Sequence, residues 1–497
     1  MADNAAVILD RTPVLVGLGE LVYRPGAGAA PDPAEMMAEA TRRAAADAQS
    51  DTLLDHLDVI AVAPSAGWLD GDPGARVGEL LGSEARTVRS SMQGGNGPQL
   101  LLGVLAGRIA AGELDSAVVC GGEALYTLAR EGAQPPGWAV ADIGRAAGEV
   151  LESEADPGTP AERDVGLIAP IMAYPLIENA IGHARGEGVA EHLQRISELW
   201  ARFSEVAAEQ PCAWTPTVHT AGELALASPS NRLVTHPYRK LHNANIQVDQ
   251  AAAVIVCSAA HARSLGVPAD RWVFLHASAA AADVWNLSER DRLDRSPAIA
   301  ACGRALFEHA QIGPDDLALI DLYSCFPAAV QLAAGELGLD LRRPLTCTGG
   351  LTFFGGPGNN YATHGVVAVA RRLREAEAGS VGLASALGWY ATKHALGVYG
   401  NSPPPRPFAA LEPAVAHPPE RAVAPAGARY DATAETATVI YERDGSPSYG
   451  ILFALLADGR RVLGTTREPP VLEAIVRDGF LGSAVAVAAD RSFEPTP

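Results

Sequence analysis

The chain has 497 residues, which is too long for one ordinary domain and ample for several buried cores. Hydrophobic residues make up 48% and charged residues 19%, with 50 Gly and 36 Pro, a profile that excludes a disordered or fibrous chain. The 38 basic residues are outnumbered by 58 acidic ones, and the formal net charge is -20. Nucleic acids and anionic membrane surfaces are therefore not expected as partners.

The cysteine pattern and the apolar runs narrow the class further. The 6 cysteines contain no C-x-x-C pair, which argues against a zinc ribbon and favours free thiols in a reducing compartment. The longest apolar runs, such as 251–260, have about ten residues and fall short of the roughly 20 needed to cross a bilayer. We expect a cytoplasmic protein with no metal site and no membrane association.

Residues 1–124 alternate short apolar strands with helical segments, the pattern of α/β architecture with parallel strands. We predict strands at 14–17, 59–63 and 116–120, and helices at 34–48 and 99–111. With a return segment at roughly 210–250, this region forms a first half of the core.

Residues 125–246 lack that alternation and hold one clear helical segment, at 190–208, among several loops. An excursion of this length from an α/β core is more often functional than accidental. We expect it to cover a site.

The alternation resumes in a second half at 247–402. The expected elements are strands at 251–257, 272–276, 318–323 and 381–386, and helices at 297–309, 327–337 and 361–376.

Residues 403–434 are rich in proline and should form a linker without helix or strand. Beyond it, residues 435–497 contain short β-prone runs separated by the turn dipeptides Asp444-Gly445 and Asp458-Gly459, which favour tight hairpins. A small antiparallel β domain is predicted there.

Two segments resemble the thiolase superfamily. Residues 110–123 run from a helix end through a strand to Gly121-Gly122-Glu123, like the thiolase segment that closes with Gly-Gly-x-Glu. Residues 248–254 resemble the Asn-Asp-Gly-Ala-Ala-Ala entry into the second thiolase half. The whole chain is most similar to the actinobacterial thiolase-like proteins that carry an additional C-terminal β domain and are named acetyl-CoA acetyltransferases by descent.

The resemblance implies a fold and an assembly. The core would consist of duplicated βαβαβαββ halves in α/β/α/β/α layers, followed by an OB-like β domain. Thiolases pair through an edge strand of the first half, here 116–120, so the protein would be a monomer or a homodimer.

The matched catalytic loops depart from the thiolase pattern. The nucleophilic cysteine falls on Gly95, the oxyanion-hole histidine falls on Gly356, and the C-x-G loop with the acid/base cysteine falls on 386–388, Ala-Leu-Gly. Claisen condensation needs a thiolate and a base, which glycine and alanine cannot supply. Ordinary thiolase activity would need a replacement thiol such as Cys325 or Cys347.

Five residues are candidates for chemistry at these loops. The resemblance places Tyr323 and Cys325 in the second loop, where steroid side-chain aldolases also have a tyrosine that transfers protons. Tyr361 and His364 are three residues apart and share one helix face, and His394 follows the last loop. Each also has a structural reading: a core tyrosine with a satisfied hydroxyl, a structural histidine, or a small buried thiol.

A further segment matches the part of thiolases that touches the pantetheine arm of CoA. Its candidate binding residues are Arg239, Lys240, His242, Asn243 and Asn245. Arg239 and Lys240 would face the CoA phosphates, although a solvated surface is the alternative reading. Coenzyme A is expected as part of the substrate, with no tightly bound cofactor.

Two functions follow from the resemblance and the losses. The first is an acyl-CoA-binding protein without the nucleophilic cysteine that carries out carbon–carbon chemistry, of retro-aldol or Claisen type, on a CoA thioester. The alternative is a non-catalytic acyl-CoA-binding or scaffolding protein that recruits a partner through its β domain.

Overall fold

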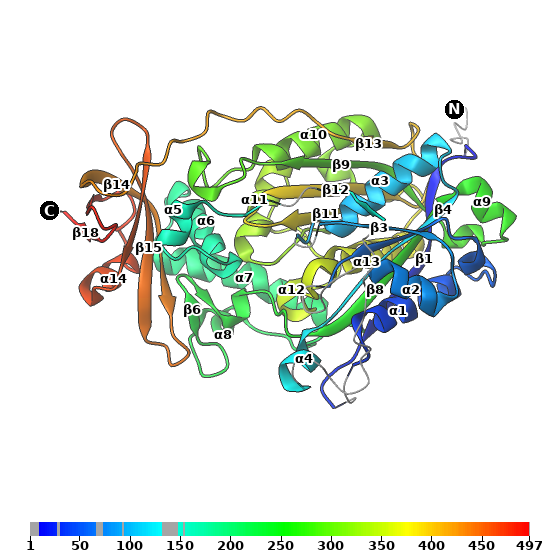
Figure 1. The fold of residues 1–497 in the computed structure, drawn as a ribbon, viewed down its shortest axis with the longest axis horizontal. Helices are drawn as coiled ribbons and strands as arrows, with labels where there is room; N and C mark the ends of the chain where they lie inside the picture. The colour runs from blue at the N-terminus through cyan, green and yellow to red at the C-terminus, as the bar shows by residue number, and fades with distance from the viewer. Residues whose placement is uncertain are drawn as a thin grey trace.

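The computed structural model describes residues 9–26, 30–65, 73–91, 94–131, 148–152 and 155–496. A layered α/β body carries a separate β sheet at one end, formed mainly by the last part of the chain (Figure 1). None of the described helices is long and apolar enough to cross a bilayer.

In the described part of the chain, eleven strands form one mixed sheet in the order β10-β11-β12-β9-β1-β8-β4-β2-β3-β5, with β13 beside β9. Their bounds are β1 Pro13–Val22, β2 Val59–Ala63, β3 Arg86–Arg89, β4 Ser116–Ala124, β5 Glu149–Val150, β8 Asp249–Ser258, β9 Val273–Ala282, β10 Leu317–Asp321, β11 Val381–Gly388, β12 Lys393–Gly400 and β13 Ala409–Leu411. The two halves of the core join where β1 meets β9.

The helices lie on and between the strands. Their bounds are α1 Pro33–Asp47, α2 Pro73–Leu81, α3 Gly97–Ala111, α4 Leu125–Glu131, α5 Pro160–Asp164, α6 Pro170–Ala184, α7 Val189–Ala208, α8 Ala221–Ala225, α9 Ala259–Ser264, α10 Pro297–Ala310, α11 Pro327–Leu337, α12 Gly350–Phe353 and α13 Tyr361–Glu375. Both α3 and α13 contact strands of the two halves, whereas α1 covers β1 and β8 and α10 covers β9 and β12. The predicted layering is therefore confirmed.

Close packing of α1 on β1 depends on two glycines. A Cβ on Gly19 would lie 2.0 Å from the Ala40 carbonyl oxygen, and one on Gly17 would lie 2.3 Å from that of Ala44. Any side chain at these positions would push the helix off the sheet, because backbone atoms cannot rotate away.

The strand directions differ from the expectation of a parallel sheet. β1, β8 and β12 pair antiparallel with their neighbours, and β9 pairs antiparallel with β1 and β12, while parallel pairs occur between β2 and β4, between β10 and β11 and between β13 and β9. The expectation that 116–120 is an edge strand is also wrong, because β4 lies between β2 and β8. A buried central strand shows the same apolar sequence pattern whether it pairs parallel or antiparallel with its neighbours, so the sequence did not indicate the strand directions.

The excursion contains a second long helix, α6, that the sequence pattern did not indicate. Pro175 lies inside this helix, and an internal proline normally argues against one. α6 packs against α11 and against β14 of the C-terminal sheet, so the excursion joins the core to the C-terminal part.

The C-terminal sheet includes strands from the excursion. Its members are β14 Tyr430–Tyr441, β15 Pro447–Leu455, β16 Arg461–Thr466, β17 Ala484–Val487 and β18 Phe493–Pro495, with β6 Leu233–Thr235 and β7 Tyr238–Arg239, and the helix α14 Pro469–Ile475 lies beside them. Gly445 and Gly459 have φ of +88° and +87° in the turns that join β14 to β15 and β15 to β16. The predicted hairpins are confirmed.

The proline-rich segment is held to the rest of the molecule at several places. β13 pairs with β9 at Ala277–Ala279, and β14 begins at Tyr430, so the expectation of no strand in 403–434 is wrong at both. Residues 408–411 contain no proline and can donate to a ladder. Further on, Arg421 donates hydrogen bonds to Asp291 Oδ1 at 2.6 Å and to the Gly459 carbonyl oxygen at 3.0 Å.

Cleavage in this segment is expected to leave the molecule in one piece. Glu420 is exposed and is followed by Arg421, so a glutamate-specific protease should cut after it, because exposed loops are preferred sites of nicking. The fragments should still elute together in gel filtration, since Ile440 of β14 pairs with Thr235 and the Asn179 side chain donates to the Ala437 carbonyl oxygen at 2.8 Å. Glu420→Gln is the uncut control, and elution of a separate core fragment would contradict the expectation.

Candidate functional site

Four loops meet at the place where the thiolase resemblance puts the catalytic groups. They precede α3, α11 and α13 and connect β11 to β12. The backbone N–H of Gly94, in the first loop, donates to Asn359 Oδ1 of the third at 2.9 Å, and the Leu387 carbonyl oxygen of the fourth lies beside Gly95. Residues 92 and 93 of the first loop lie outside the described residues.

The phenol of Tyr323 occupies the space that a side chain at position 95 would need. A Cβ on Gly95 would lie 2.0 Å from Tyr323 Oη, 2.5 Å from its Cζ and 2.8 Å from the Leu387 carbonyl oxygen. Contacts this short do not occur between real atoms, so glycine at 95 and tyrosine at 323 fit each other. The Tyr323 ring of the second loop thus fills the space beside the first loop.

A lysine fills the neighbouring space. A Cβ on Gly94 would lie 2.8 Å from Lys393 Nζ, and one on Gly388 would lie 2.9 Å from Lys393 Cε. Lys393 is 4% exposed; its ammonium donates to Glu152 Oε2 at 2.8 Å, and Asn96 Nδ2 donates to Glu152 Oε1 at 2.8 Å.

The buried cation at position 393 is a lysine and not an arginine. Lys393 and Lys240 are the only lysines in a chain with 38 basic residues, and both fall in segments matched to thiolase functional segments. The planar guanidinium of arginine is wider than an ammonium. The narrow space between Gly94 and Gly388 therefore favours lysine at position 393.

Tyr323 is a buried phenol whose hydroxyl makes no hydrogen bond to the described residues. Its backbone N–H donates to Ser385 Oγ at 2.9 Å, and its ring meets Tyr361 edge-on with centroids 5.4 Å apart. Burial, with a smaller contribution from the neighbouring Cys325, raises the pKa of Tyr323 above its ordinary value. The phenol stays protonated at neutral pH and can donate a proton or a hydrogen bond.

Tyr361 has partners for its hydroxyl. The hydroxyl lies 2.6 Å from Thr348 Oγ1 and 3.4 Å from Ser324 Oγ. Burial and the nearby charge of Asp321 raise the pKa of Tyr361 well above its ordinary value. Of the two tyrosines in contact, Tyr323 is therefore the one whose hydroxyl has no hydrogen-bond partner among the described residues.

Both candidate histidines are held by buried carboxylates. His364 Nδ1 lies 2.6 Å from Glu20 Oε1, and His394 Nε2 lies 3.0 Å from Asp283 Oδ2. Successive side chains of a strand point to opposite faces, so His394 on β12 points away from the face on which Lys393 meets the loops. The structure thus brings Tyr323 and Tyr361 together and ties the two histidines elsewhere.

The cysteines near the loops are poor nucleophiles. Burial raises the pKa of Cys325 and that of Cys347 to about 12. The thiolate is the reactive form, and at neutral pH both groups are thiols.

Three residues of the predicted CoA segment are engaged in internal contacts. His242 Nε2 lies 3.0 Å from Ser197 Oγ, and burial together with the charge of Arg239 lowers the pKa of His242 to about 3. The Asn243 amide donates to the Arg239 carbonyl oxygen at 2.6 Å, and Arg239 Nη1 donates to the Pro237 carbonyl oxygen at 2.7 Å. These internal contacts hold the backbone of the segment in its conformation.

The other two residues of the segment have different surroundings. Lys240 is exposed. The backbone of Asn245 accepts a hydrogen bond from the Gly356 N–H at 2.9 Å and donates to the Leu351 carbonyl oxygen at 3.0 Å. Asn245 therefore borders the loop that in thiolases carries the oxyanion-hole histidine.

Sequence reasoning missed the group of Lys393, Asn96 and Glu152. Lys393 stands beside His394 in a matched loop, but the alternation that separates them needs β12, which was not predicted. Among the described residues, no three His, Cys, Asp or Glu side chains gather in a way that would hold a metal ion.

Comparison with solved structures gives the fold and the family. The structure of a monomeric SCP2-thiolase-like protein type 1 from Mycobacterium smegmatis matches with a TM-score of 0.82 and 30% identity, covering 99% of this chain and 100% of that one. The chain belongs to this thiolase-like family. A family model described as the thiolase-like protein type 1 additional C-terminal domain matches residues 410–492.

Two more distant structures share the thiolase-like fold. The Ltp2-ChsH2(DUF35) aldolase matches with a TM-score of 0.60 and 16% identity, covering 79% of this chain and 98% of that one. The acetyl-CoA acetyltransferase of Syntrophomonas wolfei gives 0.56 and 14%, covering 79% and 99%.

Curated relatives match only in part. An acetyl-CoA acetyltransferase of Methanothermobacter thermautotrophicus is 34% identical over 109 residues, which are 22% of this chain and 27% of that protein. One of Methanocaldococcus jannaschii is 28% identical over 146 residues, 29% of this chain and 36% of that protein. The chain thus spans about a third of the length of these relatives or less.

Proposed function

We propose that this thiolase-like protein binds a CoA thioester and carries out carbon–carbon bond chemistry of retro-aldol or Claisen type without a cysteine-bound acyl intermediate. The observation that carries the proposal is the placement of the Tyr323 hydroxyl 2.0 Å from where a side chain at 95 would begin. A nucleophile cannot stand there, whereas a protonated phenol does. A protein of similar fold is called an aldolase, which is compatible with this assignment.

Tyr323 would act as a proton carrier. In retro-aldol cleavage of a β-hydroxyacyl-CoA, the Cα–Cβ bond breaks and its electron pair moves to Cα. The phenol donates its proton to Cα, and the phenolate recovers a proton from the β-hydroxyl as the carbonyl product forms. The products are an aldehyde or ketone and a shortened acyl-CoA, and Tyr323 returns to its starting state.

CoA would approach over the segment that ends at Asn245. Lys240 is exposed and positively charged, so it can reach a phosphate as a point charge. Arg239, His242 and Asn243 would hold the segment in place through the internal contacts described above, and Asn245 would border the thioester.

The test uses purified full-length protein and a panel of β-hydroxyacyl-CoA and β-ketoacyl-CoA compounds, with products followed by mass spectrometry. Chain-shortened acyl-CoA appearing in stoichiometric amounts with a carbonyl product supports the proposal. Tight binding of every compound without turnover contradicts it and favours the non-catalytic acyl-CoA-binding or scaffolding function.

A variant separates binding from chemistry. Lys240→Ala should weaken CoA binding about 10-fold, since a hydrogen bond to a charged group contributes about 1.5 kcal/mol, while the maximal rate stays unchanged. Arg477→Ala is the matched control, because Arg477 is an exposed cation that follows the end of α14 and has a side chain 69% exposed. Equal effects of the two substitutions would remove Lys240 from the binding site.

A further inference from the structure

The fourth loop of the site, which joins β11 to β12, contains two residues with a left-handed backbone. Trp389 has a φ of +57° and Ala391 has a φ of +55°, and the Cβ of any residue other than glycine makes this conformation unfavourable. Strained backbone at a functional site persists only when the surrounding structure holds it. The loop leads directly into Lys393, so the contacts that hold it also place that ammonium.

The hydroxyl of Tyr174, on α6, binds the fourth loop at both strained residues. It donates to the Trp389 carbonyl oxygen at 3.0 Å and accepts from the Ala391 N–H at 3.1 Å. Tyr174 is buried, and burial raises the pKa of its hydroxyl well above its ordinary value. The phenol therefore keeps its proton at neutral pH and makes both hydrogen bonds.

The ring of Tyr174 lies against the second loop. It stacks on Phe326 with ring centroids 4.4 Å apart, and Tyr238 of β7 stacks on the same ring with centroids 5.7 Å apart. Phe326 belongs to the loop that carries Tyr323. One side chain of α6 thus contacts both the loop with the phenol and the loop that leads to the ammonium.

α6 is fixed to the C-terminal sheet on both sides of Pro175. A proline has no N–H, so the Ile171 carbonyl oxygen lacks its donor within the helix. Thr235 of β6 replaces that donor with its Oγ1, at 2.9 Å. Thr436 of β14 donates to the Leu176 carbonyl oxygen at 2.6 Å. Hydroxyls of the C-terminal sheet therefore hold the part of α6 from which Tyr174 extends.

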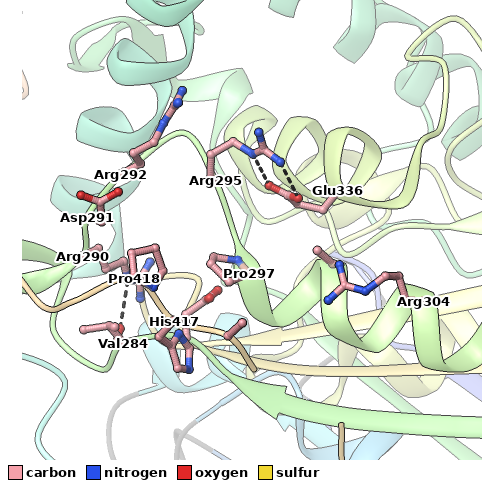
Figure 2. Close-up of a pocket in the computed structure, with 13 residues that line it drawn as sticks. Val284, Arg290, Asp291, Arg292, Arg295, Pro297, Arg304, Glu336, His417 and Pro418 are labelled. Carbon is pink, nitrogen blue, oxygen red and sulfur yellow. Dashed lines mark hydrogen bonds and ion pairs between the residues drawn. The ribbon is translucent and has the colours of Figure 1, made fainter. Parts of the chain in front are cut away.

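The same sheet supports the fourth loop at its other end. Arg290 donates from Nη2 to Thr392 Oγ1 at 2.8 Å, and from Nε to the Val284 carbonyl oxygen at 3.0 Å (Figure 2). Arg461 of β16 donates to the Arg290 carbonyl oxygen at 2.7 Å. Glu435 of β14 binds Arg461 through both carboxylate oxygens. The fourth loop is thus held at Trp389, Ala391 and Thr392 by residues that rest on the C-terminal sheet.

We propose that Tyr174 is a positioning residue for the chemistry at Tyr323, and that the C-terminal sheet serves this site by supporting Tyr174 through α6. The inference rests on the function proposed above. Because reacting groups must be placed closely, even a 1 Å displacement by a distant substitution can lower a rate by about 10²-fold. The Tyr174 hydroxyl is engaged by the fourth loop, so this residue acts through placement and not through proton transfer.

Hydrogen exchange of the full-length protein tests the contact without a substrate. Tyr174→Phe keeps the stacking on Phe326 and removes both hydrogen bonds to the fourth loop. The Ala391 amide, followed by mass spectrometry of a peptide spanning the loop, should then exchange at least about 10-fold faster. Tyr399→Phe is the matched control, because it removes an equally buried hydroxyl that donates to Gln99 Oε1 at 2.6 Å. Equal exchange of the loop in wild type and Tyr174→Phe would overturn the proposal.

The cleavage rate tests whether this contact matters for the chemistry. With a substrate that the wild type cleaves, Tyr174→Phe should lower the maximal rate at least about 10-fold and change KM less than about 2-fold. Adding Ala391→Gly should recover part of the rate, since glycine adopts a φ near +55° without strain. A tyrosine that only stabilises the fold would show neither the selective loss in maximal rate nor the recovery, and either result would contradict the assignment.

Thr436→Val tests the support from the C-terminal sheet. It removes the hydrogen bond to the Leu176 carbonyl oxygen and should change loop exchange and rate in the same direction as Tyr174→Phe, by about 3-fold. Thr438→Val is the matched control, because Thr438 is buried on the same strand but donates to the His236 carbonyl oxygen at 2.8 Å. Equal effects of the two valines would exclude this role of the sheet. A wild type without turnover contradicts the proposed function, and the exchange rates then decide by themselves whether Tyr174 holds the loop.

Discussion

Replacing Gly95 by cysteine is expected to destabilise the protein and not to create a thiolase. The new Cβ would overlap Tyr323 Oη, which lies 2.0 Å from its position, and overpacking of this kind costs about 1–3 kcal/mol. Urea denaturation should show a lower free energy of unfolding. After incubation with acetoacetyl-CoA, intact-mass analysis should show no acetyl adduct, because the acid/base cysteine and the oxyanion-hole histidine are also missing.

Two further variants separate the overlap from other effects. In a Tyr323→Ala background, the Gly95→Cys change should cost much less, giving a coupling free energy of about 1 kcal/mol or more in a double-mutant cycle. Gly335→Cys is the matched control, since an added Cβ at this exposed position of α11 has no neighbouring atoms within 4 Å. A stable acetyl adduct on position 95 would contradict the account.

Much of the fold could be predicted from the hydrophobic pattern and from the residues that begin and end helices. α11 begins at Pro327 and ends before Gly338, which has φ +71°, and both residues are visible in the sequence. β2 is a continuous apolar run between Asp58 and Pro64. α6 was missed because Pro175 interrupts its pattern, and the directions of the central strands leave no mark in a buried apolar run.

The sequence indicated Tyr323 and Tyr361 as candidates and glycine at 95, but not how the side chains of the site fill its space. The sequence shows glycine where a thiolase has its nucleophile, but which side chain takes up the space depends on the approach of the Tyr323 loop to the Gly95 loop. The same limit applies to the histidines. Glu20 and Asp283 lie on β1 and after β9, far in sequence from His364 and His394, and nothing local marks them as partners.

The glycines of the site fit the side chains that come to them from other loops. Lys393 needs glycine at 94 and at 388, and Tyr323 needs glycine at 95. A cysteine placed at position 95 would meet the tyrosine from another loop. The glycines at 94, 95 and 388 are therefore part of one arrangement with Lys393 and Tyr323.

Tyr323→Phe should lower the maximal rate of carbon–carbon cleavage by about 10²-fold or more, the usual range for a group that transfers protons. Phenylalanine keeps the ring and its edge-on contact with Tyr361, and no hydrogen bond to a described residue is lost, so the free energy of unfolding should change little. Because burial raises the pKa of Tyr323, the phenol loses its proton only at a pH above the ordinary range for tyrosine. The wild-type rate should therefore show no loss from this group between pH 6 and 9.

Tyr361→Phe is the matched control. It should lower the free energy of unfolding by about 1 kcal/mol through the lost hydrogen bond to Thr348 and leave most of the cleavage rate. Cys325→Ala should lower the rate even less. Equal rates for wild type and Tyr323→Phe would remove Tyr323 from the mechanism.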